Sequence, residues 1–207
     1  LKLYPDFMIK TGRKFKNVNK KIKVFSGNSY DYNLYLKTKP KNINLKNYGL
    51  YLEAPSPLYL GDSYFDGVKL SDLGTPDIWF KSLNRFFNLI EKYKKIKIKI
   101  VAHPKVKHKN KYPPYYFGRE ILKLKLPEVA KNSKIIISRD SVGASFAAIH
   151  NKPAVFIFTD EFTLKKNNFL ENQNFFANSL GTEAINIDAN FDEKKIKKLF
   201  SFNRKVY

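Results

Sequence analysis

The sequence predicts an α/β fold in which a parallel sheet is flanked by helices. From Tyr48 onward, short apolar runs alternate with stretches of helical periodicity. The segment Lys134 to Phe158, KIIISRDSVGASFAAIHNKPAVFIF, shows a strand, a polar turn, a short helix and a second strand in that order. A crossover helix is the connection that parallel strands need. We therefore expect one Rossmann-like sheet of about five or six strands.

The elements follow from apolar runs, turn residues and helix signals. The expected strands are Lys21–Phe25, Tyr48–Glu53, Lys95–Ala102, Ile135–Ile137, Ala154–Phe158 and Ala184–Asp188. The expected helices are Ser29–Leu36, Thr75–Lys94, Val142–His150, Phe169–Leu180 and Asp192–Phe200, with a helical turn at Pro127–Asn132. Between them, Lys105–Glu120 reads as a basic, aromatic loop that leads into a helical stretch.

The longest helix has the most complete set of signals. Thr75 supplies a capping hydroxyl, Pro76 suits the first helical position, and Asp77 places an acid in the first turn. Apolar residues then recur at intervals of three and four as far as Tyr93, which predicts one buried face.

The strand KIKIKIVA alternates isoleucine with lysine from Lys95 onward. Alternation of this kind predicts a strand with one face in water, at least over its first half. We therefore do not expect it to be a fully covered central strand.

The N-terminal part has a different character. Leu1 to Asn19 shows no clear periodicity, and Thr38 to Lys46 is polar and contains a proline, as linkers do. We place the boundary so that residues 1–45 form an N-terminal remnant and linker and residues 46–207 form the Rossmann-like domain. Leu1 is not a start methionine, and we expect Leu1 to Asn19 to be either a connecting segment or the tail of a part whose beginning is missing.

The composition is strongly basic, with 39 Lys and Arg against 18 Asp and Glu and a formal net charge of +21. Such charge favours nucleic acid, an anionic membrane surface or an anionic substrate as a partner. Most of it is lysine spread along the chain beside abundant Asn and Ile, a bias that an AT-rich coding sequence also produces. We therefore do not expect nucleic acid as the partner.

Several classes of protein are disfavoured. Cysteine is absent, which excludes disulfides and thiolate metal sites, and the three histidines are scattered. No run approaches the roughly 20 apolar residues of a membrane span, so we expect a cytoplasmic protein. GxGxxG and GxxxxGK[ST] are both missing, which disfavours a nicotinamide enzyme and a P-loop NTPase.

The candidate site lies where the expected strands end, since ligands of open parallel sheets bind outside the carboxyl ends of the strands. Three elements fall there: the loop after Glu53, the pair His103 and Pro104, and the turn from Ser138 to Gly143. The turn starts a helix, and a helix start beside hydroxyl groups can hold a phosphate. The alternative is that Asp140 or Ser141 only caps the helix.

Individual side chains leave alternatives open. His103 is a phosphate or ribose donor, a general acid, or only a polar strand end, whereas His108 and His150 are expected to be solvated or to act as local caps. Arg119 and Arg139 either bind a phosphate through two hydrogen bonds or are ordinary exposed arginines near a loop. The carboxylates that could act as a base are also typical turn formers: Asp31, Asp62 and Asp66.

The sequences IVAHP, FGRE and IIISRDSVGASFAAIHNKPAVFI occur in an order that resembles the C-terminal half of GT-B glycosyltransferases, which assemble bacterial capsule and lipopolysaccharide. YGLYLEAPSP and SYDYNLYL are similar to the same group. The resemblance covers most of the chain.

The resemblance implies a metal-independent glycosyltransferase that takes a nucleotide-sugar as substrate, needs no cofactor and transfers to a glycan or glycolipid acceptor. His103 would be the catalytic residue at the donor phosphates, and Lys152-Pro153 would start the next strand. It also implies contact with the inner face of an anionic membrane. The implied donor-binding residues are Pro104, Lys105, Arg119, Ser138, Asp140, Ser141, Val142 and Gly143.

The chain departs from this group in two ways. The family's common acidic residue in the first strand-end loop is Asp, where this chain has Glu53, and only about 45 residues stand in place of a complete acceptor domain. Two other functions therefore stay open. One is a non-catalytic module that binds nucleotide-sugars or polyanions, with Lys105 to Tyr116 as its contact with nucleic acid. The other is an epimerase of nucleotide-sugars.

Overall fold

The computed structural model describes residues 7–11, 22–38, 45–59, 61, 74–161 and 169–201. The chain divides into two compact units, residues 1–40 and 41–207. Each unit is described by itself.

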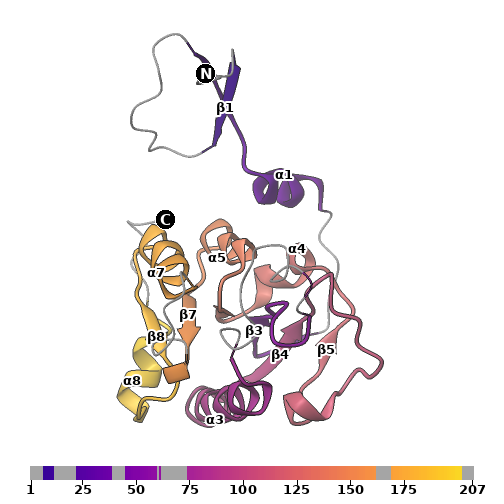
Figure 1. Cartoon of the computed structure of the whole chain (residues 1–207), viewed down its shortest axis with the longest axis vertical. Coiled ribbons are helices and arrows are strands. Elements are labelled where there is room, and N and C mark those ends of the chain that lie inside the picture. Colours follow the sequence, from indigo (N-terminus) through magenta and orange to yellow (C-terminus); the bar gives the residue numbers. More distant parts are fainter. Residues whose placement is uncertain are drawn as a thin grey trace. The chain divides into compact units, whose positions relative to one another are not determined.

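The first unit holds two parallel strands and a helix (Figure 1). β1 (Phe7–Thr11) pairs with β2 (Lys23–Gly27), and Phe7 lies opposite Lys23. α1 (Tyr30–Lys37) begins after Ser29, whose Oγ accepts a hydrogen bond from the Tyr32 N–H. The sequence predicted β2 and α1 but missed β1, because its five residues FMIKT neither alternate strictly nor form an apolar run.

The second unit is built on a parallel sheet with the strand order β5-β4-β3-β6-β7-β8 (Figure 1). Its six strands are β3 (Tyr48–Leu52), β4 (Lys97–Val101), β5 (Ile121–Leu122), β6 (Ile136–Ser138), β7 (Ala154–Phe158) and β8 (Ala184–Asn186). The described helices of this unit are α3 (Pro76–Lys94), α4 (Leu126–Val129), α5 (Ser145–Ile149), α7 (Phe169–Ser179) and α8 (Glu193–Lys198). This architecture confirms the predicted Rossmann-like α/β fold.

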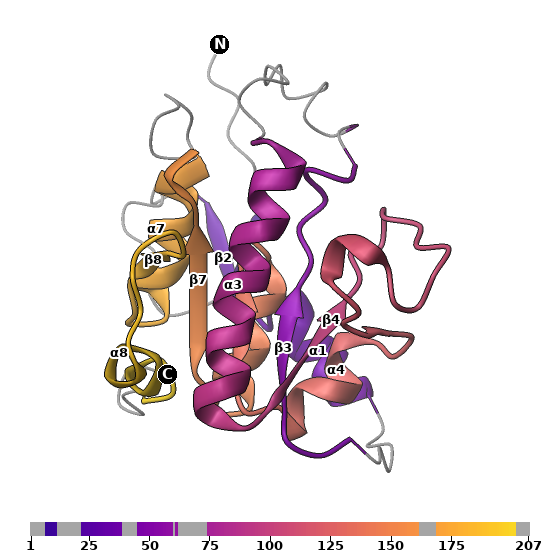
Figure 2. The same ribbon diagram turned by 90° about the horizontal axis from the view of Figure 1, so that it is seen from below.

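Helices cover both faces of the sheet, as parallel sheets require. Figure 2 shows α3 lying across one face, where Trp79, Phe87 and Ile90 pack in one core with Tyr51 and with Ile196 of α8. Side chains of the other face meet α7, since the ring of Phe156 in β7 stacks on that of Phe176 with a centroid separation of 6.2 Å. Every residue of β3 is buried because this central strand has neighbours on both edges and both faces.

The expectation about β4 was confirmed, and that about β5 was wrong. β4 lies between β3 and β5, and its buried isoleucines alternate with a wet face on which Lys97 is exposed and Lys99 is half-buried in an ion pair with Glu120. The residues after the basic loop form β5 instead of a helix. Two residues are too few to give a periodic pattern, so only the tertiary pairing of Ile121 with Ile100 defines this strand.

α3 begins and ends where the sequence predicted, but the role given to Thr75 was wrong. The Thr75 hydroxyl donates to Glu161 Oε1 at 2.6 Å, and its backbone N–H donates to Glu161 Oε2 at 2.8 Å. These two bonds connect the start of α3 to the residues that follow β7. The Thr75 side chain accepts no hydrogen bond from the first turn of the helix and so does not cap it.

The strand order defines a switch point. The chain starts the sheet at β3, builds outward to β5, then returns to the other side of β3 with β6 and builds outward to β8. Because the direction of building reverses between β3 and β6, the loops after these two strands leave in opposite directions. A crevice at the carboxyl ends of the strands is the usual result, and ligands of this fold bind in it.

Gly49 tests the packing of the central strand. A Cβ at this position would stand 2.7 Å from Ile135 Cγ2 and 2.9 Å from Ile98 Cδ1. We expect Gly49→Ala to destabilise the second unit by about 1–3 kcal/mol through overpacking, measured by urea denaturation. Lys97→Gln, at the exposed register partner of Tyr48, is the control and should change stability by less than about 0.5 kcal/mol. Equal stability of both variants would contradict this packing.

Candidate functional site

The carboxyl ends of β3, β4 and β6 bring the three predicted elements together. Leu52 pairs with Val101 on one side and with Ser138 on the other. The residues that follow these three positions therefore lie side by side. We call them the switch-point site, defined as residues 53–56, 103–105 and 138–143.

Glu53 is the centre of the hydrogen bonds on one side of the site. Glu53 is only 3% exposed. Oε1 accepts from the Tyr116 hydroxyl at 2.7 Å, and Oε2 accepts from the backbone N–H of His103 at 2.9 Å and lies 2.8 Å from His108 Nε2. A carboxylate so surrounded positions the loop after β4 and does not itself face a ligand.

His108 was expected to be solvated, and this expectation was wrong. Its side chain is 6% exposed and lies between Glu53 and the Tyr115 hydroxyl, which is 2.6 Å from Nδ1. The buried hydroxyl of Tyr116 completes the cluster, and burial together with the nearby Tyr51 and Glu53 raises the pKa of Tyr116. The only sequence signal for this network is the nearness of His108 to the pair Tyr115-Tyr116 in a proline-interrupted loop.

His103 stands half-buried at the start of that loop. Its Nδ1 accepts a hydrogen bond of 3.3 Å from the backbone N–H of Lys105. In the neutral imidazole, Nε2 therefore carries the proton and is a donor. Pro104 and Lys105 are exposed next to it.

The turn from Ser138 to Gly143 is held by its own hydroxyl groups. Ser138 Oγ accepts from the Ser141 N–H at 2.9 Å, and Ser141 Oγ accepts from the Gly143 N–H at 3.2 Å. Ser141 therefore caps the start of the helical segment, as the alternative interpretation predicted, and Ser138 holds the turn before it. The turn continues as a short 3₁₀ helix, Val142–Ala144, ahead of α5.

Val142 and Gly143 differ in what they offer. Val142 is 65% exposed, and its N–H donates no hydrogen bond within the described part of the chain. A Cβ on Gly143 would lie 2.8 Å from Leu126 Cδ2 and 3.5 Å from Leu52 Cδ1. Gly143 thus permits close packing of leucine side chains, whereas the Val142 N–H is the group of this turn that a ligand could reach.

Arg139 joins the two walls of the switch point. It is 2% exposed, and its Nη1 donates to the carbonyl of Ser56 at 3.2 Å. Its Nε and Nη2 each lie 3.0 Å from Asp140 Oδ2, and its guanidinium lies 5.7 Å from the centre of the Trp79 ring. Asp140 is therefore the counter-ion of Arg139, and the pair fixes the loop after β3 against the turn after β6.

Arg119 points away from the site. Its guanidinium donates to Asn84 Oδ1 at 2.7 Å, to Asn88 Oδ1 at 2.6 Å and to Glu91 Oε2 at 3.1 Å, all on α3. These bonds fasten the segment before β5 to the helix. The structure thus gives Arg119 a structural role and does not bring it together with the switch-point site.

The remaining candidates lie elsewhere. Asp31 belongs to α1 in the first unit, while Asp62 and Asp66 are outside the described residues. His150 follows α5, where burial and the positive charges of Lys152 and Lys131 lower its pKa. Among the described residues, no cluster of histidine and carboxylate side chains could bind a metal ion, and no helix is long and apolar enough to cross a membrane.

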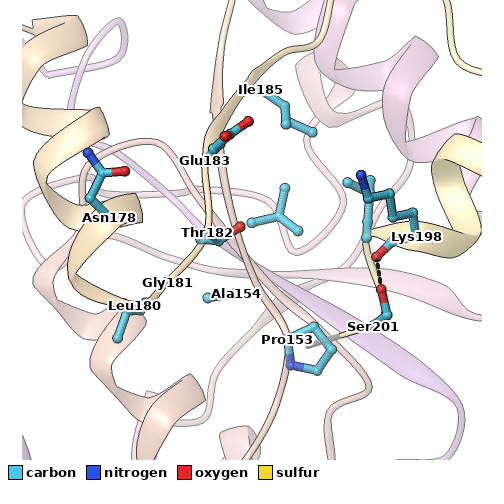
Figure 3. A pocket seen from close by; sticks show the side chains of 12 residues that line it. Pro153, Ala154, Asn178, Leu180, Gly181, Thr182, Glu183, Ile185, Lys198 and Ser201 are labelled. Atoms are coloured by element: carbon cyan, nitrogen blue, oxygen red, sulfur yellow. Dashed lines mark hydrogen bonds between the residues drawn. The ribbon is translucent and has the colours of Figure 1, made fainter. Parts of the chain in front are cut away.

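A cavity of about 560 Å³ lies at the opposite end of the sheet, where β7 and β8 begin. Figure 3 shows Asn178, Leu180 and Gly181 on one side of it, Lys198 and Ser201 on the other, and Ala154 and Pro153 between them. It is separated from the switch-point site by the length of the strands and shares no residue with it.

No protein-family model, curated protein or solved structure matches this chain.

Replacing Glu53 tests its role as the anchor. We expect Glu53→Ala to cost about 3–5 kcal/mol of stability, because it leaves His108 and the Tyr116 hydroxyl buried without their partner. Glu53→Gln keeps the shape and one acceptor oxygen and should cost less. Urea denaturation measures the stability, and hydrogen exchange of the His103 amide reports the release of the loop.

The exposed Glu183 provides the control, since Glu183→Gln removes the same charge without a buried partner. If the His103 amide exchanged equally slowly in Glu53→Ala and in Glu183→Gln, Glu53 would not hold the loop.

Proposed function

We propose that this chain is a glycosyltransferase-like protein that binds a nucleotide-sugar donor at the switch-point site. The observation that carries the proposal is the reversal of strand order between β3 and β6. Sheets with this order bind nucleotides at the reversal, outside the carboxyl ends of the strands. The resemblance of the motifs around His103 and Ser138 to GT-B glycosyltransferases supports a sugar-linked nucleotide as the ligand.

The chemistry of the site suits a phosphate group. His103 presents Nε2–H as a donor, Lys105 adds a positive charge, and the Val142 N–H opens the 3₁₀ helix on the facing wall. Developing negative charge on a departing nucleotide phosphate is stabilised by such pre-positioned donors. Under this proposal His103 is the catalytic residue, and no metal ion takes part.

Exposed apolar side chains also gather at this edge. Tyr59 follows β3, Ile78 lies in the first turn of α3, and Val142 lies after β6; each is between 36% and 65% exposed. Exposed apolar groups on loops beside a polar crevice are typical of ligand sites. They give the base or sugar of a donor a surface to pack on.

The acceptor half of the reaction rests on the resemblance alone. A glycan or glycolipid acceptor, and a role in capsule or lipopolysaccharide synthesis, follow from the family and from no residue of the switch-point site. An epimerase acting on the same donor remains the second enzyme class, and it would convert the donor without an acceptor.

The structure gives less support to the nucleic-acid alternative than the sequence did, because two tyrosines of the basic loop pack inward. Tyr115 and Tyr116 would have been stacking residues, but their rings lie 5.1 and 5.2 Å from Phe80 and contribute hydroxyls to the buried Glu53 and His108 cluster. Aromatic rings that pack inward cannot stack on bases, which leaves Tyr112, at 49% exposure, as the exposed tyrosine of the loop Lys105 to Tyr116.

The decisive test uses a backbone donor. Val142→Pro removes one N–H at the first position of the 3₁₀ helix, where proline fits the backbone. Val142→Ala keeps that N–H and is the matched control. Among CMP, UDP, GDP and their sugars, we expect one nucleotide class to bind, and we expect Val142→Pro and His103→Ala each to weaken its binding roughly tenfold or more, measured by calorimetry. Val142→Ala should bind within about threefold of the unchanged chain.

If no nucleotide or nucleotide-sugar of this panel bound, the proposal would be lost. Equal binding by Val142→Pro and Val142→Ala would remove the helix start from the site while leaving the crevice. Once a donor is known, release of nucleotide with and without added glycan distinguishes transfer from epimerisation.

A further inference from the structure

The end of the sheet where the strands begin carries a row of lysines. The pairing of Ile136 with Ala154 places Lys134 next to Lys152, two residues earlier on each strand. The pairing of Leu50 with Ile136 in turn places Lys134 beside Tyr48, and Tyr48 pairs with Lys97 on its other side. We call the lysines around the starts of the four adjacent strands β4, β3, β6 and β7 the lysine surface: Lys46, Lys95, Lys97, Lys131, Lys134 and Lys152.

These charges are not neutralised within the described part of the chain. All except Lys152 are exposed, and none of the six forms an ion pair there. The nearby Glu91 is occupied by Arg119 and by the backbone N–H of Ile98. Burial and the charge of Lys134 lower the pKa of Lys152, so the positive groups are close enough to repel one another.

The character of this surface selects its partner. It holds lysines and no arginine, so it offers point charges without the paired donors that read phosphates individually. No large apolar or aromatic side chain of the described residues is exposed on it, which excludes base stacking and insertion into hydrocarbon. Helices of this fold end here with their carbonyl groups, so the surface also lacks the N–H groups that hold one phosphate.

We propose that this lysine surface docks the protein electrostatically on an anionic lipid bilayer. The row crosses four strands at about 4.8 Å spacing, or roughly 14 Å, and Lys95 and Lys131 broaden it in the second direction. Clusters of four to eight basic residues bind anionic membranes in this way. The strands then point away from the bilayer, so the switch-point site stays open. This proposal does not depend on the ligand of that site.

The test compares two variants with the same net charge. The surface variant changes four exposed lysines of the set: Lys46→Gln, Lys97→Gln, Lys131→Gln and Lys134→Gln. The control variant changes four exposed lysines elsewhere: Lys81→Gln, Lys107→Gln, Lys109→Gln and Lys123→Gln. Co-sedimentation of the 207-residue chain with vesicles of phosphatidylcholine, with or without phosphatidylglycerol, measures the binding.

We expect binding only to the vesicles that contain phosphatidylglycerol, and reversal of this binding by salt. The surface variant should bind roughly 100-fold to 1,000-fold more weakly, since each lysine near the membrane contributes about fivefold. The control variant should lose much less of its affinity for these vesicles. Thermal unfolding verifies that both are folded; if the surface variant is not, Lys131→Gln with Lys134→Gln is the substitute and should lose roughly 10-fold to 30-fold.

Three results would overturn the proposal. The first is no binding to anionic vesicles near physiological salt, and the second is an equal loss in both variants, which would indicate net charge alone. The third is tighter binding of duplex DNA than of vesicles with the same dependence on these lysines, because the partner would then be nucleic acid.

Discussion

The arrangement of the switch-point site depends on one buried carboxylate. Glu53 directly follows the central strand β3, and a buried carboxylate is stable only when donors surround it. Its three partners, the His103 N–H, His108 and the Tyr116 hydroxyl, all come from the segment between β4 and β5. The burial of one charge therefore determines where a whole proline-interrupted loop lies. His103 is placed by its backbone N–H, which donates to Glu53, and by its Nδ1, which accepts from the Lys105 N–H.

A second buried charge serves the opposite wall. Arg139 follows β6 and bonds to the carbonyl of Ser56, to Asp140 and to the face of Trp79. The loop after β3 and the turn after β6 are thus held by bonds within the chain. Pre-formed sites bind more tightly than sites that must be ordered on binding, because the entropic cost of ordering has already been met during folding.

The sequence was most informative where local pattern and tertiary environment agree. α3 and β7 were predicted at nearly their observed bounds, because a buried helical face and an apolar run leave little choice. β5 was missed because its two residues are a strand only through pairing with β4. The roles of His108 and Arg119 depended on contacts across many residues of chain, to Glu53 and to α3, which no local spacing reveals. The structure brings Ser138, Asp140 and Ser141 together after β6, where their polar groups stabilise the turn itself.

Lysine at the starts of the strands needs an explanation other than helix capping. Positive side chains near helix C-termini are stabilised by the helix dipole, and this accounts for Lys92 and Lys94 at the end of α3. It does not account for Lys97 or Lys134, which stand at the starts of strands. A coding bias toward lysine would enrich every surface and would leave the acidic residues distributed as before. Carboxylates stand at both ends of the sheet. Asp140, Asp160, Glu161 and Asp188 follow the strands, whereas Glu91, near the starts of the strands, is bonded to Arg119 and to the Ile98 N–H, and Glu183 stands before β8, beyond the four strands that the lysines surround. The lysines at the strand starts therefore form no ion pair among the described residues, which a uniform coding bias does not explain.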